Sequence, residues 1–359
     1  MSRVARRKLE HLDLCANGDV EARRTTLLEE VELVHEALPE LAAGEIDLSL
    51  SLFGRGLRAP ILISGMTGGA ERAGEINRAL ATAAQKYGFA LGLGSQRAMW
   101  LDPELASSYR VREVAPDVLL LANLGVVQAR DVGAAAAAEL VDAVGADALC
   151  VHLNPAQELV QDEGDRDFRG CLAAIERLVS ALPAPVVVKE TGCGLSRRTL
   201  ARLAGVGVQW VDVAGAGGTT WPGVEALRGS ARQRELGSAL REWGIPTAAS
   251  ICFARESGLE TIASGGLRDA GDIVRALALG ARLAGMALPW LRAHERGGLA
   301  GVLALAEQLD EALRALMLLV GARDVAQLAR APRVLGPRLR AWLASEAAGA
   351  CASRADMRT

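Results

Sequence analysis

Eight short apolar runs that alternate with helical patterns constrain the fold of this chain more than any other feature. The runs predict strands at Pro60–Ser64, Phe89–Leu93, Val118–Ala122, Ala148–Leu153, Pro185–Lys189, Val208–Val213, Thr261–Ser264 and Leu283–Met286. Between them, helical patterns occur at Gly74–Tyr87, Ala134–Val144, Asp167–Leu182, Ser196–Ala204 and Ala270–Leu279. Strands that alternate with helices indicate a parallel sheet. Eight such units within about 230 residues match the usual size of a TIM (β/α)8 barrel.

An open, doubly wound sheet is the alternative architecture. It would place a G-x-G-x-x-G turn after the first strand, and the sequence SGMTGG at 64–69 lacks that spacing. We therefore predict a single α/β domain, residues 1–359, built as a TIM barrel with an N-terminal extension and C-terminal helices. The expected boundaries are 1–57 for the extension, which contributes to the site, 58–295 for the barrel, 296–350 for the C-terminal helices and 351–359 for a disordered tail. The long gap 215–260 is expected to form part of a lid or pocket wall.

The charge balance excludes a general attraction to nucleic acids or anionic membranes, because the formal net charge is only -3. No apolar run approaches the length of a membrane span. The charged N-terminus lacks the apolar segment of a secretory signal. Six cysteines are scattered without C-x-x-C spacing, which is typical of reduced thiols in a cytoplasmic protein.

The segment Ala148–Glu158 predicts a functional site at the end of the fourth strand. An apolar run stops abruptly at His152, Asn154, Gln157 and Glu158. His152 and Asn154 are two residues apart, so they share one face of a strand. Gln157 and Glu158 are expected in the following loop, where a carboxylate could hold Mg²⁺. The alternative is a strand end whose polar groups merely cap the next helix.

Polar or glycine-rich segments follow the other strands as well, and active sites of TIM barrels lie at the carboxyl ends of the strands. The segments are Met66–Gly69, Gly94–Arg97, Asn123–Gly125, Lys189–Glu190, Gly215–Trp221, Ser264–Gly266 and Gly285–Ala287. Backbone without Cβ atoms can approach phosphate oxygens closely. Gly265 and Gly266 therefore predict a phosphate site, which Gly217, Gly218 and Thr219 could complete, although each glycine pair alone is more often a tight turn.

Lys189 ends an apolar run, so its ammonium group must either extend to solvent or meet an anion, because an unpaired buried ammonium is costly. Two functional roles are open: a Schiff-base nucleophile, or a cation beside an electron-rich cofactor ring. The alternative is a salt bridge to a carboxylate on a neighbouring strand.

Two further groups of residues have both a functional and a structural interpretation. Trp221 and Glu225 are four apart and hence neighbours on a helix; they form either a proton-handling pair over the pocket or a core anchor and a surface residue. Arg7 and Lys8, with His11, suit recognition of a diphosphate. The alternative is an ordinary solvated basic terminus.

In order and chemistry, these segments together resemble type II isopentenyl diphosphate isomerases, from about residue 6 to about residue 330. The resemblance implies an FMN-dependent barrel that interconverts isopentenyl and dimethylallyl diphosphate with Mg²⁺ and without net redox change. NADPH or another reductant would keep the flavin reduced. The resemblance also implies a homo-oligomer, either a tetramer or an octamer.

The resemblance assigns residues to four roles. Those expected to line FMN are Met66, Thr67, Gly68, Ser95, Asn123, Lys189, Thr219, Gly265, Gly266, Met286 and Ala287. Those expected to hold the diphosphate substrate are Arg7, Lys8, His11, Ser95, Arg97, His152, Asn154 and Gln157. Glu158 would bind Mg²⁺. The catalytic set would be Gln157, Trp221, Glu225 and His152, with Trp221 and Glu225 relaying protons to and from the flavin.

The chemistry is consistent with these roles. No ordinary side-chain acid readily protonates an unactivated alkene, so N5 of reduced FMN is a sensible proton carrier. Lys189 would stabilise an anionic reduced ring. Mg²⁺ on Glu158, with Arg7, Lys8 and His152, would neutralise the diphosphate.

Two rival functions remain. A 2-hydroxy-acid oxidase would share Lys189 and the Ser264–Gly266 loop, but it needs a histidine base and an arginine pair late in the barrel, where only Arg268 stands, without an adjacent histidine. A flavin-binding protein without catalysis would not need Gln157, Glu158, Trp221 or Glu225.

Overall fold

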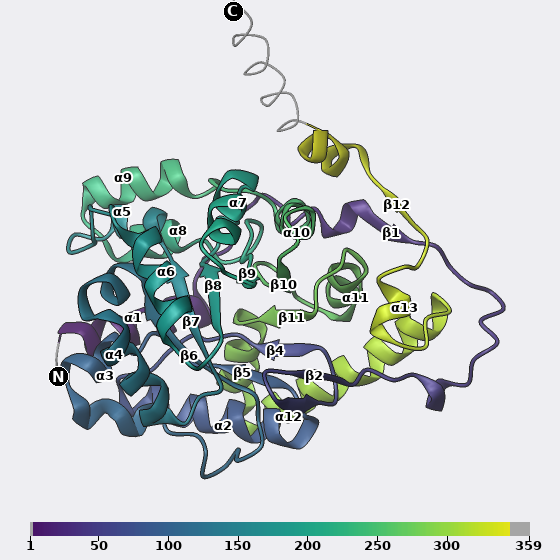
Figure 1. Cartoon of the computed structure of the whole chain (residues 1–359), viewed down its shortest axis with the longest axis horizontal. Helices are drawn as coiled ribbons and strands as arrows, with labels where there is room; N and C mark the ends of the chain where they lie inside the picture. The colour runs from purple at the N-terminus through teal and green to yellow at the C-terminus, as the bar shows by residue number, and fades with distance from the viewer. Residues whose placement is uncertain (1–2, 345–359) are drawn as a thin grey trace, which may run out of the picture.

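Eight parallel strands form a closed barrel at the centre of the computed structural model, which describes residues 3–344 (Figure 1). The strands are β4 (Ile61–Ile63), β5 (Ala90–Gly92), β6 (Leu120–Gly125), β7 (Ala148–Leu153), β8 (Val186–Glu190), β9 (Trp210–Asp212), β10 (Glu260–Ala263) and β11 (Leu283–Met286). They pair in chain order, and the pairing of β11 with β4 closes the ring. The predicted TIM barrel is confirmed.

The barrel strands are apolar on both faces because helices cover them outside and side chains fill them inside. Every residue of β4, β6 and β11 is buried. All eight strands lie at the predicted positions, but β6 runs to Gly125 instead of ending at Ala122. Asn123 therefore lies within this strand and not after it.

Helices surround the barrel, and the five that the sequence predicted are among them. The helices of this ring are α2 (Glu71–Tyr87), α4 (Val126–Val144), α6 (Cys171–Ala181), α7 (Arg197–Gly205), α10 (Thr247–Glu256), α11 (Ala270–Ala278) and α12 (Leu288–Leu319). In α2, Ala73, Ile76, Leu80 and Ala84 are buried at the spacing of one helical face. This stripe packs α2 against the barrel and α12.

Short helices follow several strands at the carboxyl end of the barrel. They are α3 (Arg97–Leu101), α5 (Pro155–Val160), α8 (Trp221–Arg228) and α9 (Ala231–Leu240). The prediction of a loop for Gln157 and Glu158 is wrong, because Pro155 opens the short helix α5 at a position where proline is tolerated. The gap 215–260 contains α8, α9 and α10.

The N-terminal extension covers both ends of the barrel. Helix α1 (Arg3–Asn17) packs against α8 and α12 on the carboxyl side. At the other end, the hairpin of β2 (Leu50–Leu52) and β3 (Arg55–Leu57) adds Leu52 and Leu57 to the apolar cluster inside the barrel. The ring of Phe53, at the turn, lies edge-on to Trp210 with centroids 5.0 Å apart.

A small antiparallel ribbon joins the N-terminal extension to the C-terminal part of the chain, at the right of Figure 1. It pairs β1 (Val31–Leu33) with β12 (Arg333–Leu335), beyond α13 (Val325–Leu328). Three 3-10 turns complete the elements, at Leu28–Glu30, Ala43–Glu45 and Pro103–Ser108. The predicted tail, 351–359, and the last residues of the predicted C-terminal helices lie outside the described residues.

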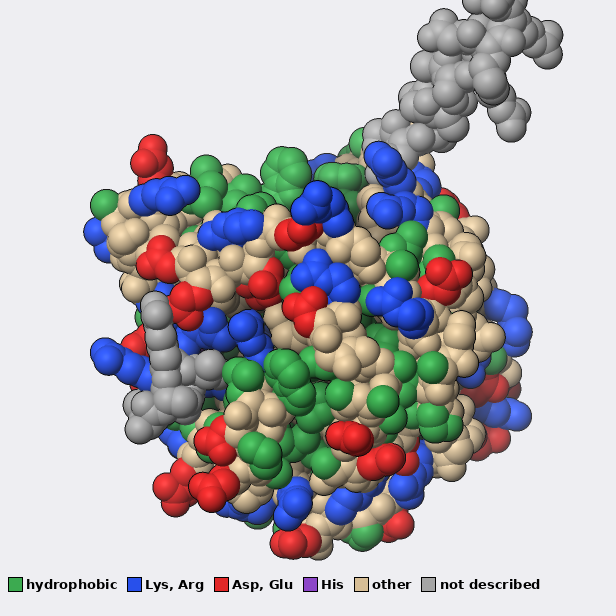
Figure 2. Space-filling model, turned by 60° about the vertical axis from the view of Figure 1, so that its left-hand side comes forward, with side chains coloured by type: hydrophobic (Ala, Val, Ile, Leu, Met, Phe, Trp, Pro, Cys, Tyr) green, Lys and Arg blue, Asp and Glu red, His purple; other side chains and the backbone are tan. Residues whose placement is uncertain are grey.

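Acidic and basic side chains are interspersed over the face of the molecule that Figure 2 shows, in keeping with the small net charge. Among residues 3–344, no helix has the length and apolar character needed to cross a membrane.

Trp290→Ala is expected to lower the free energy of unfolding by about 3–5 kcal/mol, because Trp290 is fully buried beside Phe89. Trp243 is 67% exposed, so Trp243→Ala is a matched control with an expected change of about 0.5 kcal/mol or less. Urea unfolding followed by circular dichroism measures both values. Equal effects of the two substitutions would contradict the packing described here.

Candidate active site

A cavity opens at the carboxyl end of the barrel, under helix α1. Most of the residues predicted for the site line this one cavity, and the exceptions are Gly68, Gly217, Gly218 and Glu225. The predicted residues that line it are Arg7, Lys8, His11, Met66, Thr67, Ser95, Arg97, Asn123, His152, Asn154, Gln157, Glu158, Lys189, Thr219, Trp221, Gly265, Gly266, Met286 and Ala287. The strand ends therefore do converge, as expected for this fold.

Gly68 and Glu225 do not line the cavity. A Cβ atom on Gly68 would lie 2.0 Å from the ring of Tyr109. This glycine therefore packs against Tyr109, the residue whose hydroxyl contacts Lys8. Glu225 lies fully buried behind Gln157 and Gln161. The alternative that placed Glu225 on the surface is wrong, whereas the roles predicted for Gly68 and Glu225 stay predictions.

Lys8 enters the cavity from α1 and is one of its few cations. Its Nζ donates to the Ser95 carbonyl oxygen (2.9 Å) and to the Tyr109 hydroxyl (2.7 Å). Burial, with a smaller contribution from Arg7, lowers the pKa of Lys8 to about 7. A bound anion would favour the charged form. The view of this segment as a solvated basic terminus does not hold for Lys8.

His152 is held in the cavity wall by Asn123. The His152 Nδ1 and Asn123 Oδ1 atoms lie 2.8 Å apart, across the neighbouring strands β7 and β6. Burial, followed by the charges of Lys189 and Lys8, lowers the pKa of His152 to about 4. At neutral pH the imidazole is therefore uncharged, its proton lies on Nδ1 and is donated to Asn123 Oδ1, and Nε2 is left as a hydrogen-bond acceptor.

Asn154, Gln157 and Glu158 form a compact group at the start of α5. The Asn154 amide donates to Glu158 Oε1 (2.9 Å) and to Gln157 Oε1 (3.2 Å). The second carboxylate oxygen, Glu158 Oε2, accepts from the Asp165 backbone N–H (2.8 Å). The described residues hold no cluster of three or more histidine, cysteine or acidic side chains of the kind that binds a metal unaided.

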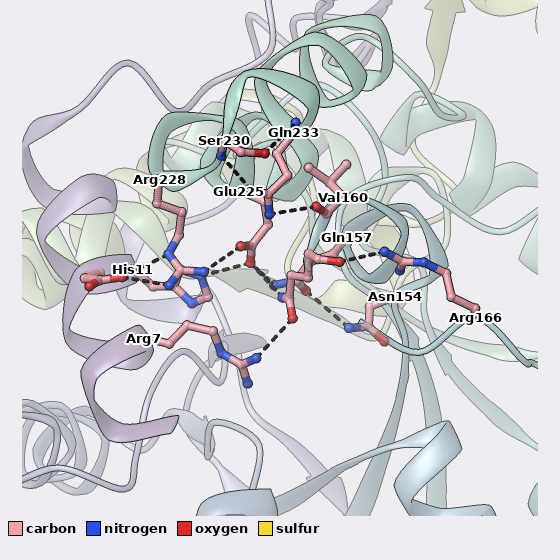
Figure 3. Close-up of polar contacts among 12 residues, drawn as sticks. Arg7, His11, Asn154, Gln157, Val160, Arg166, Glu225, Arg228, Ser230 and Gln233 are labelled. Atoms are coloured by element: carbon pink, nitrogen blue, oxygen red, sulfur yellow. Dashed lines mark hydrogen bonds and ion pairs between the residues drawn. The ribbon is translucent and has the colours of Figure 1, made fainter. Parts of the chain in front are cut away.

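The end of α5 is fixed by side chains from two other segments. Arg166 donates to the carbonyl oxygens of Glu158 and Gln161, the latter at 2.6 Å. Gln233 of α9 donates to the Val160 carbonyl oxygen (3.2 Å). These donors satisfy carbonyl groups that a helix end leaves unpaired, so Gln157 and Glu158 stand on a well-supported turn. Figure 3 shows Arg166 and Gln233 on either side of this turn.

Glu225 collects donors from three directions (Figure 3). Its Oε1 accepts from Gln157 Nε2 (3.1 Å) and Gln161 Nε2 (2.7 Å), and Arg228 donates to Oε2 (3.0 Å). His11 Nε2 lies 2.9 Å from Oε1. Burial opposes ionisation, but His11, Gln157 and Arg228 outweigh it and hold the pKa of Glu225 at about 2. In this arrangement Glu225 is an ionised, weakly basic group.

Lys189 forms the salt bridge that was its structural alternative. Its Nζ lies 2.8 Å from Asp212 Oδ2 on the neighbouring strand β9, and it also donates to Ser264 Oγ (2.9 Å). Ser264 in turn donates to Asp212 Oδ1 (2.6 Å). Lys189 still lines the cavity, so pairing with Asp212 fixes its ammonium group there and leaves a cationic role open.

The two glycine loops pack against each other, while the phosphate site predicted for them stays a prediction. A Cβ atom on Gly218 would lie 2.5 Å from the Gly266 Cα, and one on Gly265 would lie 2.2 Å from the Gly215 carbonyl oxygen. Gly265 and Gly266 both have positive φ, at 96° and 80°. Backbone lies directly against backbone here, which glycine alone permits. Near these loops, the buried hydroxyls of Ser64 and Thr67 line the cavity and have no partner among the described residues.

Sequence reasoning missed several residues of the site. Gln161, Arg166 and Arg228 support the predicted residues from outside the strand ends, and Asp212 pairs with Lys189. Spacing could have indicated Gln161, which lies four residues after Gln157 and therefore on the same side of a helix. Nothing in the sequence points to Arg228 over other surface arginines.

Comparison with known proteins identifies close relatives over nearly the whole chain. A family model described as FMN-dependent dehydrogenase matches residues 128–334. Isopentenyl-diphosphate delta-isomerase of Thermococcus onnurineus is 44% identical, covering 94% of this chain and 93% of that protein. The enzymes of the same name from Methanothermobacter thermautotrophicus and a Synechococcus species are 45% and 50% identical. They cover 95% and 82% of this chain and 96% and 86% of their own lengths.

Solved structures show the same fold at low sequence identity. A mandelate oxidase variant with the monooxide FMN adduct superposes with a TM-score of 0.63 at 20% identity, over 93% of this chain and 99% of that one. Mandelate oxidase with (S)-2-phenylpropionate gives a TM-score of 0.61 at 21% identity, over 93% and 97%. These likenesses support the barrel architecture alone.

Lys8→Met is expected to remove a pH dependence of stability. The pKa of Lys8 is about 7 in the folded protein and about 10.4 in an unfolded chain. Between these values the unfolded chain binds more protons, so wild-type stability rises with pH across this window. The stability of wild type relative to Lys8→Met should rise by up to about 1.4 kcal/mol per pH unit. Urea unfolding between about pH 7 and 10 measures this difference.

Lys86→Met is the control, because Lys86 lies on the outer surface of α2 and no cavity residue contacts it. Its stability relative to wild type should stay constant with pH. If the stability difference between wild type and Lys8→Met were also constant with pH, the lowered pKa of Lys8 would be contradicted.

Proposed function

Because the chain belongs to the family of isopentenyl-diphosphate delta-isomerases, we propose that it interconverts isopentenyl and dimethylallyl diphosphate with reduced FMN and Mg²⁺. One observation carries the proposal: a single cavity combines the cationic residues of α1 with an apolar wall and two glycine loops. Leu12, Leu288 and Leu291 contribute to that wall. An isoprenoid diphosphate has a charged end and a hydrocarbon end, and this cavity offers surfaces for both.

The residues present fit FMN. Gly265 and Gly266 line the cavity, so backbone without Cβ atoms is available there for a phosphate. Thr67 and Ser64 offer unpartnered hydroxyls, and Lys189 offers a fixed positive charge. Bound in its reduced form, FMN would supply a proton donor and acceptor for the substrate carbons, which no side chain of ordinary acidity provides. The proposed reaction has no net redox change, so NADPH would serve only to reduce the flavin.

Glu158 fits a Mg²⁺ site that the substrate completes. Mg²⁺ is commonly held by one or two carboxylates together with substrate phosphates and water. A single buried carboxylate, oriented by Asn154 and the Asp165 backbone, matches this mode. The absence of a larger acidic cluster among the described residues agrees with it. Glu158 would thus bring the cation to the diphosphate.

The chain's own residues would bind and orient the substrate. Arg7 and Lys8 would bind the diphosphate, and Lys8 would become fully charged on binding. His152, a neutral imidazole whose proton lies on Nδ1 and is donated to Asn123, would accept a hydrogen bond at Nε2. Gln157 would orient the hydrocarbon end while Glu225 holds its amide. A proton relay through Trp221 and Glu225 stays a prediction, and it requires that the donors around Glu225 rearrange when ligands bind.

A 2-hydroxy-acid oxidase is a weaker proposal for this site. Such an enzyme needs arginines free to bind a carboxylate substrate. Arg268 lines the cavity, but it donates to Glu21 through Nε (2.8 Å) and Nη2 (2.5 Å), and Arg292 also pairs with Glu21 (3.0 Å). These arginines are thus already paired with an internal carboxylate. A homo-oligomer and a cytoplasmic location remain predictions.

Thr67→Val is expected to raise the Kd for FMN by about 5- to 10-fold, because it deletes one hydrogen-bonding group from the proposed FMN site. The cofactor-free protein should be equally stable or more stable, since the substitution removes an unpartnered buried hydroxyl. Quenching of flavin fluorescence measures the Kd. Thr82→Val on α2, outside the cavity, is the control, and a shared Kd for both variants would remove Thr67 from the FMN site.

The central test is isomerisation in D₂O. The protein with anaerobically reduced FMN and Mg²⁺ should convert isopentenyl diphosphate to deuterated dimethylallyl diphosphate, observed by NMR, and the oxidised protein should not. Deuterium enters because protons exchange with solvent during the transfer. A reducible flavoprotein that forms no product would contradict the proposed function.

Two substitutions separate the roles in α5. Gln157→Ala should retain bound flavin but lose isomerisation by about 100-fold or more, as expected when a substrate-orienting group is removed. Glu158→Gln should raise the Mg²⁺ concentration needed for half-maximal rate. Unchanged turnover in the first variant, or an unchanged Mg²⁺ response in the second, would remove that residue from its assigned role.

A further inference from the structure

Helix α1 reaches the cavity from outside the barrel, yet it carries Arg7, Lys8 and His11. Helix α1 belongs to no sheet, and in the described structure backbone hydrogen bonds to the barrel loops hold only the segment that follows it, where Thr220 N donates to Val20 O and Ala22 N donates to Gly218 O. The position of α1 over the cavity therefore depends on packing against α8 and α12 and on polar side-chain contacts. The contacts on the α8 side converge on Glu225.

Arg228 joins α1 to Glu225 directly. Its Nη1 donates to Glu225 Oε2 (3.0 Å), while Nε and Nη2 donate to Glu10 Oε2 at 3.1 and 2.7 Å. One guanidinium group thus bridges a carboxylate on α1 and a fully buried carboxylate on α8. The planar group has donors on both sides and suits such a bridge, which a lysine could not reproduce fully.

Two further connections run parallel to this bridge (Figure 3). Arg7 Nη1 donates to Gln161 Oε1 (3.1 Å), and Gln161 Nε2 donates to Glu225 Oε1 (2.7 Å). His11 lies beside the same oxygen, and its ring meets Trp221 edge-on at 5.2 Å. Helix α1 is thus connected to one buried anion through three of its residues, 7, 10 and 11.

Removing a partner from a buried charge is costly, because the remaining charge keeps its desolvation penalty. Arg228 is the one guanidinium group that donates to Glu225 in the described structure, and it is about one-quarter exposed. Arg6 also pairs with Glu10 (3.2 Å), but its side chain is 74% exposed and it does not reach Glu225. The two arginines share a partner on α1 and differ in their link to the barrel.

We propose that Arg228 is a positioning residue that keeps α1 docked over the cavity by bridging Glu10 and Glu225. It touches neither the substrate nor the cofactor in this role. Through α1 it sets where Arg7, Lys8 and His11 stand, and so governs the binding of the diphosphate. The second half of this inference rests on the proposed function, whereas the docking of α1 does not.

The test combines amide exchange with kinetics on the FMN-loaded protein. In Arg228→Gln, backbone amides of α1 should exchange with deuterium about 10-fold faster or more than in the wild type, while those of α2 stay unchanged. The KM for isopentenyl diphosphate should rise by about 10- to 100-fold, the effect expected from lost hydrogen bonds to charged groups. The flavin spectrum should not change. Arg228→Lys should restore part of the KM.

Arg6→Gln is the matched control and should behave as the wild type in both measurements. Glu10→Gln is the second variant, because it breaks the bridge at α1 and leaves Arg228 on Glu225 in case Arg228→Gln fails to fold. It should show the same faster exchange of α1 and a raised KM with little change in kcat.

Two outcomes would overturn the proposal. One is amide exchange of α1 at the wild-type rate in both Arg228→Gln and Glu10→Gln. The other is faster exchange that extends equally to α2, which would indicate a general loss of stability. If the wild type fails to isomerise isopentenyl diphosphate, the proposed function falls, and the exchange of α1 still decides whether Arg228 holds the helix.

Discussion

The buried carboxylate of Glu225 is the constraint on which the arrangement of this site depends. A charge removed from water must be surrounded by donors, and here those donors come from α5 and α8, while His11 of α1 lies 2.9 Å from one carboxylate oxygen. Meeting this requirement draws together three segments that are remote in sequence. The orientations of Gln157 and His11 in the cavity wall are constrained by their contacts with Glu225. A single buried anion therefore fixes the positions of several residues on the side of the cavity that α1 covers.

The inner half of the cavity, formed by the strand ends of the barrel, is held by other interactions. There the barrel supplies rigid strand ends, and the salt bridge of Lys189 with Asp212 fixes a charge between neighbouring strands. Gly265 and Gly266 add backbone without side chains to the lining of this half. The barrel thus presents a preorganised surface for a flat, phosphorylated cofactor, whereas the extension supplies the groups suited to a charged substrate. The site is built at the junction of the two.

The sequence predicted the barrel and most of the cavity because both depend on local patterns. Apolar runs mark strands, and polar residues directly after them mark the carboxyl face, so His152 and Lys189 could be placed in advance. The helical turn that carries Gln157 was missed because a one-turn helix has too few residues for a periodic signal. Arg228 and Asp212 could not be assigned, since their importance comes from partners brought close only by the complete fold.

The extension that covers both ends of the barrel has a consequence for biosynthesis. The ribosome makes its residues first, but their partners come much later: Glu10 pairs with Arg228, and β1 pairs with β12 near residue 334. Contacts of such sequence separation form late, because the loop between them must close first. A nascent chain can therefore form most of its barrel strands before helix α1 docks on the barrel. Docking of α1 over the cavity therefore has to follow the synthesis of α8 and α12, the helices against which it packs.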